Sequence, residues 1–124
     1  MWEIAGERQS VRLRALMAGE RPLLIPGAYD ALSARIAERV GFGAVYLSSL
    51  GTALSLVGLP DAGLTTATEM VETARRVADA VGVPVIADAD DGYGNAINVM
   101  RTVRDCIASG VGGVHIDDQL APVR

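Results

Sequence analysis

Residues Val83–Gly94 read Val-Pro-Val-Ile-Ala-Asp-Ala-Asp-Asp-Gly-Tyr-Gly, an apolar run that ends abruptly in three carboxylates and two glycines. A short run rich in β-branched residues, opened by a proline, is typical of a parallel strand buried on both faces. Side chains alternate along a strand, so Asp88 and Asp90 are expected on one face and Ala87 and Ala89 on the other. The segment therefore predicts a buried strand that delivers carboxylates to a loop.

These carboxylates suggest a metal site. Two like charges about 7 Å apart on one face repel each other unless a cation, a proton or water offsets them. Oxygen ligands without a neighbouring Cys or His suit Mg²⁺ or Mn²⁺, so a divalent metal is one interpretation. A solvated Asp-Asp-Gly turn is the other, and the spacing alone leaves both open.

Length and composition limit the class of protein. The 124 residues are enough for one domain, 1–124, and half of them are hydrophobic although only 4% are aromatic, which favours strands and helices packed in layers. A net charge of −4 without a basic stripe argues against nucleic acid as a partner. The single Cys106 fits a reducing compartment, and no apolar run approaches the roughly 20 residues of a membrane helix. We expect a cytoplasmic protein with no membrane partner.

Helical periodicity alternates with short apolar runs along the chain. An N-terminal helix within residues 1–20 precedes strand-helix repeats in residues 21–124, and helix caps are expected at Asp30, Thr66 and Asn95. Besides the strand that follows Gly82, strands are expected at 23–25, 44–48 and 114–117. Such alternation predicts a parallel sheet, either open and doubly wound or closed into a barrel. In both, ligands bind at the carboxyl ends of the strands.

Two helices and one loop are predicted in more detail. The helix after Asp30 should carry one apolar stripe, formed by Leu32, Ile36 and Val40. The helix after Asn95 should point a second stripe inward, formed by Val99, Val103 and Ile107. Residues 49–63 contain three glycines and a proline, so we expect an irregular loop there that carries function.

Polar side chains follow the predicted strands in pairs: Tyr46 and Ser48, Asp88 and Asp90, and His115 and Asp117. The members of each pair are two residues apart and so face one way. Structural interpretations remain open for several of them, since Tyr46 could be packing, Ser48 a turn cap and His115 a hydrogen-bonded core residue. Cys106 is interpreted as a small buried hydrophobic residue.

Five motifs occur in order along the chain: Tyr46-Leu47-Ser48-Ser49, Gly58-Leu59-Pro60-Asp61, Ala87–Gly94, Asn98–Val103 and His115–Gln119. Together they resemble the isocitrate lyase and phosphoenolpyruvate mutase superfamily, in particular its short members such as methylisocitrate lyase and oxaloacetate decarboxylase. The resemblance implies a (β/α)₈ TIM barrel, of which this chain covers about four strands, the N-terminal half. It also implies Mg²⁺, with Mn²⁺ as a substitute, and α-oxo acid substrates that react through a pyruvate-like enolate.

The resemblance implies roles for individual side chains. Asp90 would bind the metal directly, and its waters would be held by Asp88, Asp61 and Asp117. Tyr46, Ser48 and the backbone amide of Ser49 would form the pocket for the pyruvyl carboxylate and oxo group. The implied catalytic residues are Tyr46, Ser48, Asp61 and His115, and the implied substrate-binding residues are Tyr46, Ser48, Ser49 and Asp88.

Two departures from the family pattern bear on the reaction. Asp117 stands where most members have Glu, and Val123 stands where lyases and mutases carry Lys. The missing Lys favours the decarboxylase branch over the mutases and the thiol-dependent lyases. We expect a carbon–carbon lyase or decarboxylase acting on a small 2-oxo or 2-hydroxy dicarboxylate.

Three alternatives to this function are compatible with parts of the sequence. Phosphoenolpyruvate mutase-type P–C chemistry and a catalytically inactive half-barrel fragment both stay open. A phospho-receiver domain is rejected, because Pro26-Gly27-Ala28 stands where its acidic pair should follow the first strand. Four parallel strands would leave two open sheet edges, so we also expect a homo-oligomer.

Overall fold

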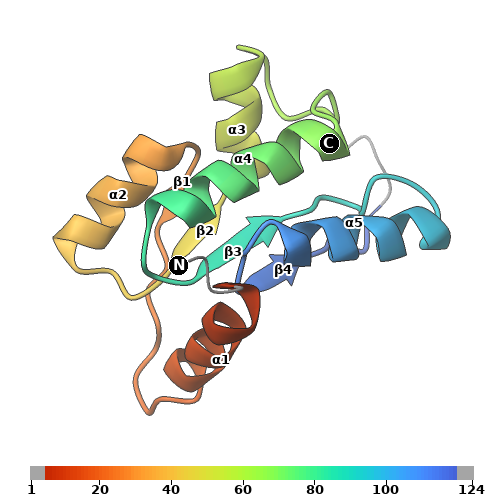
Figure 1. The fold of residues 1–124 in the computed structure, drawn as a ribbon. Helices are drawn as coiled ribbons and strands as arrows, with labels where there is room; N and C mark the ends of the chain where they lie inside the picture. The colour runs from red at the N-terminus through yellow and green to blue at the C-terminus, as the bar shows by residue number, and fades with distance from the viewer. Residues whose placement is uncertain (1–4, 120–124) are drawn as a thin grey trace.

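Four parallel strands form a single sheet in sequential order (Figure 1). The computed structural model describes residues 5–119, with side chains from residue 9 onward. The strands are β1 (Gly27–Ala28), β2 (Val45–Leu47), β3 (Val85–Asp88) and β4 (Gly113–His115). Tyr46 lies opposite Gly27 on one side and Ile86 on the other, and Asp88 lies opposite His115. The predicted parallel sheet is confirmed, and the carboxyl ends of all four strands meet at one edge of it.

The five helices are α1 (Ala5–Met17), α2 (Ala31–Val40), α3 (Ser49–Leu56), α4 (Ala67–Ala80) and α5 (Ala96–Ala108). The predicted caps of α2, α4 and α5 are confirmed. The side chains of Asp30, Thr66 and Asn95 each accept a hydrogen bond from the backbone amide of the residue three positions on. The side chain of that later residue in turn accepts one from the backbone amide of the cap residue. These helices therefore begin where short-range side-chain chemistry places them.

Helices α2, α4 and α5 cover one face of the sheet (Figure 1). The core between them uses alternate strand residues, Val45 and Leu47 of β2 and Val85 and Ala87 of β3, all of which are buried. Cys106 of α5 belongs to this core, and burial raises the pKa of its thiol, as does the charge of Asp105. Its predicted role as a small buried hydrophobic residue is confirmed.

Helix α1 packs against the amino-terminal ends of the strands. Leu13 is buried, and it packs so closely on Gly113 that a Cβ atom there would lie 3.0 Å from Cδ2 of Leu13. The Gln9 amide donates to the carbonyl of Gly82 at 3.3 Å, and the Arg12 guanidinium donates to the same carbonyl. This helix therefore closes the end of the sheet opposite the candidate site.

The first strand was predicted too early in the chain. Residues 23–25 are not a strand, and Leu24 is exposed. The strand lies three to four residues further on, at Gly27–Ala28, because Tyr46 donates its backbone N–H to the Pro26 carbonyl and Ser48 donates to that of Ala28, both at 2.9 Å. Contacts with β2, rather than local hydrophobicity, set the position of β1.

The irregular loop predicted at residues 49–63 is wrong in its first half, which forms α3. Ser48 caps this helix by accepting from the Gly51 amide at 3.2 Å. Gly51 looked like a helix breaker, but it is needed for close packing, since a Cβ there would lie 2.8 Å from Cβ of Tyr29. A glycine that permits an approach between elements cannot be told from a flexible one by sequence alone.

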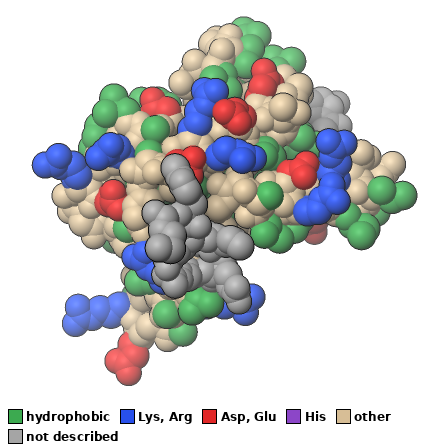
Figure 2. Space-filling view, viewed as in Figure 1, with side chains coloured by type: hydrophobic (Ala, Val, Ile, Leu, Met, Phe, Trp, Pro, Cys, Tyr) green, Lys and Arg blue, Asp and Glu red, His purple; other side chains and the backbone are tan. Residues whose placement is uncertain are grey.

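The apolar stripe expected on α2 is present, but it is not the face that packs on the sheet. Leu32, Ile36 and Val40 of α2 are 67%, 55% and 71% exposed, while the small Ala34 and Ala37 face the sheet. Figure 2 shows apolar side chains exposed around α2, interspersed with charged ones.

On α5, Val99 and Val103 are partly buried as expected, but Ile107 is 61% exposed and its neighbour Cys106 is buried instead. None of the described helices has the length and hydropathy needed to cross a membrane.

Candidate active site

The carboxyl edge of the sheet brings together polar side chains from distant parts of the chain. Ser49 begins α3 two residues after the end of β2, Asp88 ends β3, His115 ends β4, and Asp61 comes from the segment between α3 and α4. Parallel pairing places them together, because the strands all end at the same edge. This edge is where ligands bind in open and barrel-shaped α/β folds.

Ser49 lies between two carboxylates. Its Oγ is 2.8 Å from Oδ2 of Asp61 and 2.9 Å from Oδ2 of Asp88, and its backbone N–H donates to the same Asp88 oxygen at 3.3 Å. A hydroxyl carries a single proton and can donate it to only one of the two carboxylates at a time. The cluster therefore has more acceptors than donors.

Asp90 extends this cluster on the far side of Asp88. Its backbone amide donates to Oδ1 of Asp88 at 3.2 Å, and its Oδ2 accepts from the Tyr93 hydroxyl at 2.7 Å. Burial raises the pKa of Asp90, hydrogen bonds from Tyr93 and Ser49 lower it, and the charges of Asp88 and Asp61 raise it again, with a net upward shift. Asp61, Asp88 and Asp90 thus act on one another electrostatically.

The strand alternation predicted for Asp88 and Asp90 does not extend to Asp90. The strand ends at Asp88, and Asp90 has φ +45°, in the left-handed region. Tyr93, with φ +63°, is the other non-glycine residue with positive φ among the described residues. For side chains other than glycine this backbone costs roughly 1–2 kcal/mol, and such cost is retained mostly at functional sites.

A second group of side chains connects β2 to β4. The Tyr46 hydroxyl lies 2.7 Å from Nδ1 of His115, whose Nε2 lies 3.3 Å from Oδ1 of Asp117. The amide of Gln119 donates to the other Asp117 oxygen at 2.7 Å. With the imidazole N–H on Nε2 facing Asp117, Nδ1 accepts from Tyr46, so Asp117 fixes the ring and the ring fixes the phenol. Burial raises the pKa of Tyr46, as does the neighbouring Asp88 carboxylate.

The two groups are neighbours, because the backbone N–H of Asp117 donates to the Asp90 carbonyl at 2.7 Å. Ser48 has a structural role as the cap of α3, in which its oxygen accepts and its hydroxyl proton stays available for donation. All the predicted site residues therefore lie at the carboxyl edge, in the two groups around Ser49 and His115 or directly beside them. Val123 lies outside the described residues.

The chemistry of the cluster suits a cation. Its ligand atoms are carboxylate and hydroxyl oxygens, which hard divalent cations prefer, and no Lys or Arg offsets the three carboxylates among the contacts described above. Within residues 5–119 no group of three His, Cys, Asp or Glu side chains is arranged to hold a metal ion by itself. A cation here would need water among its ligands.

Two contributions to this site were not predicted. The Ser49 hydroxyl was missed, since only its backbone amide was assigned a role, and Tyr93 was assigned no role. A partial signal existed for Tyr93, because an aromatic residue between two glycines cannot be explained by the turn alone. The sequence does not show that the Tyr93 hydroxyl reaches back three residues to Asp90. This contact results from the positive φ values of Asp90 and Tyr93.

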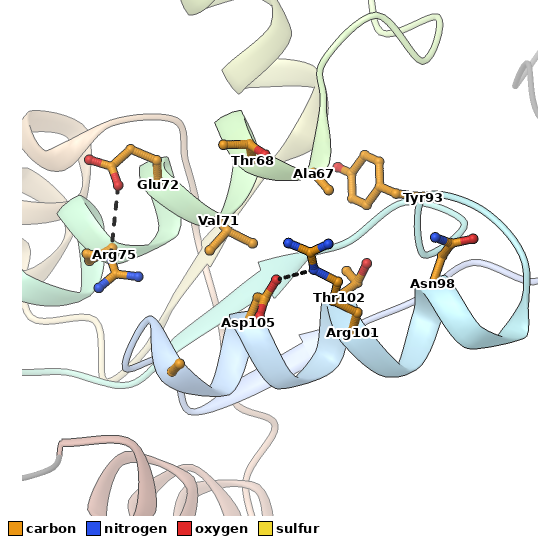
Figure 3. A pocket seen from close by; sticks show the side chains of 11 residues that line it. Ala67, Thr68, Val71, Glu72, Arg75, Tyr93, Asn98, Arg101, Thr102 and Asp105 are labelled. Atoms are coloured by element: carbon orange, nitrogen blue, oxygen red, sulfur yellow. Dashed lines mark ion pairs between the residues drawn. The ribbon is translucent and has the colours of Figure 1, made fainter.

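A separate hollow of about 450 Å³ lies between α4 and α5 (Figure 3). Its charged side chains pair with each other on their own helices, Glu72 with Arg75 at 3.9 Å and Arg101 with Asp105 at 3.4 Å. Tyr93 lines one end of it, beside the first turn of α4. Because its charges are already paired, this hollow is a weaker candidate for ligand binding than the strand edge.

Comparisons with known proteins show the family to which the chain belongs. The family model described as phosphoenolpyruvate phosphomutase matches residues 13–123. A 2,3-dimethylmalate lyase from Eubacterium barkeri is 47% identical over 113 residues, which are 91% of this chain and 39% of that protein. Other matched relatives carry the names of lyases, decarboxylases and mutases.

Solved structures give the same result. A phosphoenolpyruvate phosphomutase from Streptomyces platensis subsp. rosaceus superposes with a TM-score of 0.87 at 46% identity, covering 92% of this chain and 39% of that one. A phosphonopyruvate hydrolase in complex with oxalate and Mg²⁺ superposes with a TM-score of 0.87 at 32% identity, covering 94% and 41%. The chain thus spans about two fifths of the length of these proteins, and its four strands correspond to one part of the barrel that they form.

Proposed function

Because this chain belongs to the phosphoenolpyruvate mutase and isocitrate lyase superfamily, we propose that it supplies the metal-binding half of a Mg²⁺-dependent carbon–carbon lyase or decarboxylase. The proposed substrate is a small 2-oxo or 2-hydroxy dicarboxylate that reacts through a pyruvate-type enolate. The observation that carries the proposal is a group of three carboxylates, in which Asp61 and Asp88 contact one serine hydroxyl and Asp90 lies beside Asp88.

Four carboxylates would hold the metal. Asp90 would be its direct ligand, and Asp88, Asp61 and Asp117 would hold its waters, since Mg²⁺ usually keeps several waters and needs few protein ligands. Within residues 5–119 no three His, Cys, Asp or Glu side chains surround a metal by themselves, so water would complete the ligands of a bound cation. Bound there, the cation would supply positive charge to offset the negative charge that develops on the substrate oxygens.

Tyr46, Ser48 and Ser49 are the proposed substrate-binding residues. Ser48 has a free hydroxyl proton to donate to a substrate oxygen, because its cap role uses only its lone pairs. Tyr46 is held by His115, so its phenol is oriented before any substrate arrives. Donors fixed in this way stabilise developing charge without having to reorganise.

The test is calorimetry with Mg²⁺ and oxalate, which resembles the enolate of pyruvate. We expect oxalate to bind the wild-type chain only when Mg²⁺ is present, and Asp90→Ala to abolish both Mg²⁺ and oxalate binding. The matched control is Asp79→Ala, which removes an exposed carboxylate of α4 and should bind as the wild type does. Oxalate binding that does not depend on Mg²⁺, or no binding by the wild type, would contradict the proposal.

Phosphoenolpyruvate mutase-type P–C chemistry is the second candidate, and the description of the matching family model favours it. It would use the same carboxylates and the same cation, so binding of oxalate does not separate the two. Incubation with phosphonopyruvate and with oxaloacetate, followed by ³¹P NMR and pyruvate detection, does separate them. A catalytically inactive half-barrel is the third, and there the Mg²⁺ and oxalate titrations would show no binding.

A further inference from the structure

We propose that Tyr93 is a positioning residue that holds Asp90 with one oxygen turned toward the metal site. The inference rests on the proposed function and concerns a side chain that does not itself touch metal or substrate. Its starting point is the 2.7 Å hydrogen bond from the Tyr93 hydroxyl to Oδ2 of Asp90.

The turn that carries Tyr93 is fixed by contacts independent of Asp90. The Tyr93 backbone N–H donates to Oδ1 of Asp91 at 2.9 Å, and the buried Thr102 hydroxyl of α5 donates to the Gly92 carbonyl at 2.9 Å. Gly92 packs so closely against α5 that a Cβ there would lie 2.5 Å from Cγ2 of Val99. The turn that carries the Tyr93 phenol is therefore held by α5 and not by the contact with Asp90.

The ring of Tyr93 is anchored as well. It packs against the hydrophobic core and lines the end of the hollow between α4 and α5, next to Ala67 (Figure 3). Only the hydroxyl extends past this packing to the carboxylate cluster. Tyr93 thus connects the rigid helical layer to Asp90, whose own backbone lies in the left-handed region.

The choice of donor also has a chemical consequence. A carboxylate has two oxygens, and the phenol bonds only Oδ2, so this contact does not use Oδ1. A phenol is neutral at ordinary pH, and both burial and the neighbouring carboxylates raise its pKa further. It therefore orients Asp90 without competing with a cation for its charge, as an Arg or Lys in this place would.

The experiment compares the Mg²⁺ dissociation constants of wild type, Tyr93→Phe and Tyr29→Phe by calorimetry. Phe keeps the ring and its packing and removes only the donor. Tyr29 lies outside the cluster, with its side chain half exposed, so Tyr29→Phe is the matched control. We expect Tyr93→Phe to weaken Mg²⁺ binding 10- to 100-fold, the range for loss of a contact to a metal ligand, and Tyr29→Phe to leave it unchanged.

A melting curve without Mg²⁺ separates positioning from packing. A lower melting temperature in Tyr93→Phe with a Mg²⁺ dissociation constant within twofold of wild type would show that Tyr93 only packs, and would overturn the inference while leaving the proposed function intact. Absence of Mg²⁺ binding in wild type would overturn both.

Thr102→Val serves as the second variant if Tyr93→Phe does not fold. Val has nearly the shape of Thr and removes only the hydroxyl that anchors the Gly92 carbonyl. It lies outside the carboxylate cluster, so it can act on Mg²⁺ binding only through the turn. A several-fold weaker Mg²⁺ affinity supports the inference, and an unchanged affinity overturns it.

Discussion

Alternate residues of the same strands have opposite surroundings. Val45 and Leu47 of β2 are fully buried beneath the helices, whereas Tyr46 between them faces the other side and reaches His115. In β3, Val85 and Ala87 are buried in the core while Asp88 ends the strand among polar groups. The helix-facing residues of these two strands are apolar, and the side chains on the opposite side at the strand ends are polar and form the candidate site. Residues that stabilise the fold and residues of the candidate site therefore alternate along the same strands. Each set can nevertheless be substituted without replacing a residue of the other.

The largest effect is expected on the helix-facing side. Leu47→Ala should lower the free energy of unfolding by about 2–5 kcal/mol, because it leaves a cavity at one of the largest fully buried side chains. Urea denaturation measures the loss, and Leu54→Ala on the exposed side of α3 is the control, expected within about 0.5 kcal/mol of wild type. Folded Leu47→Ala should bind Mg²⁺ as wild type does. A weakened Mg²⁺ affinity there would show that the two sides are coupled.

The next effect belongs to the polar side alone. Asp117→Ala should weaken Mg²⁺ binding roughly 10- to 100-fold, since Asp117 would hold a metal water and also fixes His115 through a 3.3 Å contact. Asp118→Ala, which removes the exposed neighbouring carboxylate, is the control and should leave affinity unchanged. Titration calorimetry measures both. Equal affinities in the two variants would remove Asp117 from the site.

A helix cap tests whether stability can be lowered without reaching either side of the sheet. Asn95 accepts hydrogen bonds from the backbone amides of Ile97 and Asn98 at the start of α5. Asn95→Ala should cost about 1 kcal/mol of stability, and Asn95→Asp should retain most of it because Asp caps equally well. Thermal unfolding is the measurement. If both variants lose the same stability, the cap bond is not the cause.

The smallest effect concerns pH in the absence of metal. Burial raises the pKa of Asp90 in the folded state, so the folded protein holds this proton more tightly than the unfolded chain does. The resulting stabilisation is complete below the unfolded pKa and is lost as pH rises through the folded pKa. Asp90→Asn should therefore be more stable than wild type at neutral pH, with a difference that shrinks on acidification.

Urea midpoints measured between about pH 4 and pH 7 test this expectation, since that window lies above the usual Asp pKa. Adding Mg²⁺ should reverse the order of the two proteins at neutral pH, because only wild type would gain from the cation. A variant that is less stable than wild type at every pH would mean that Asp90 is stabilising in its own right.

Sequence reasoning predicted the features that short-range chemistry determines. The caps at Asp30, Thr66 and Asn95 and the parallel order of the strands follow from neighbouring residues and from alternation. The position of β1 did not, since pairing with β2 selected Gly27–Ala28 over the more hydrophobic residues before them. The exposed Leu32 and buried Ala34 of α2 show the same limit, because close packing on the sheet favoured the smaller side chain.

The candidate site divides in the same way. That Asp88 and His115 would face each other follows from strand ends in register. The contacts of the Ser49 hydroxyl with Asp61 and Asp88 depend on how the segment after α3 folds back, for which the sequence has no short-range signal. The Tyr93 contact with Asp90 depends on two left-handed residues within one turn, which only the packed structure specifies.

The position of α1 has a consequence for the order in which the molecule can assemble. Each strand pairs with the one that precedes it, so the sheet can grow as the chain leaves the ribosome. Helix α1 is synthesised first, but the Gly82 carbonyl that it binds comes 70 residues after Arg12 and 73 after Gln9. Loop closure over that distance carries an entropic cost before any contact forms, so we expect the earliest helix to dock last.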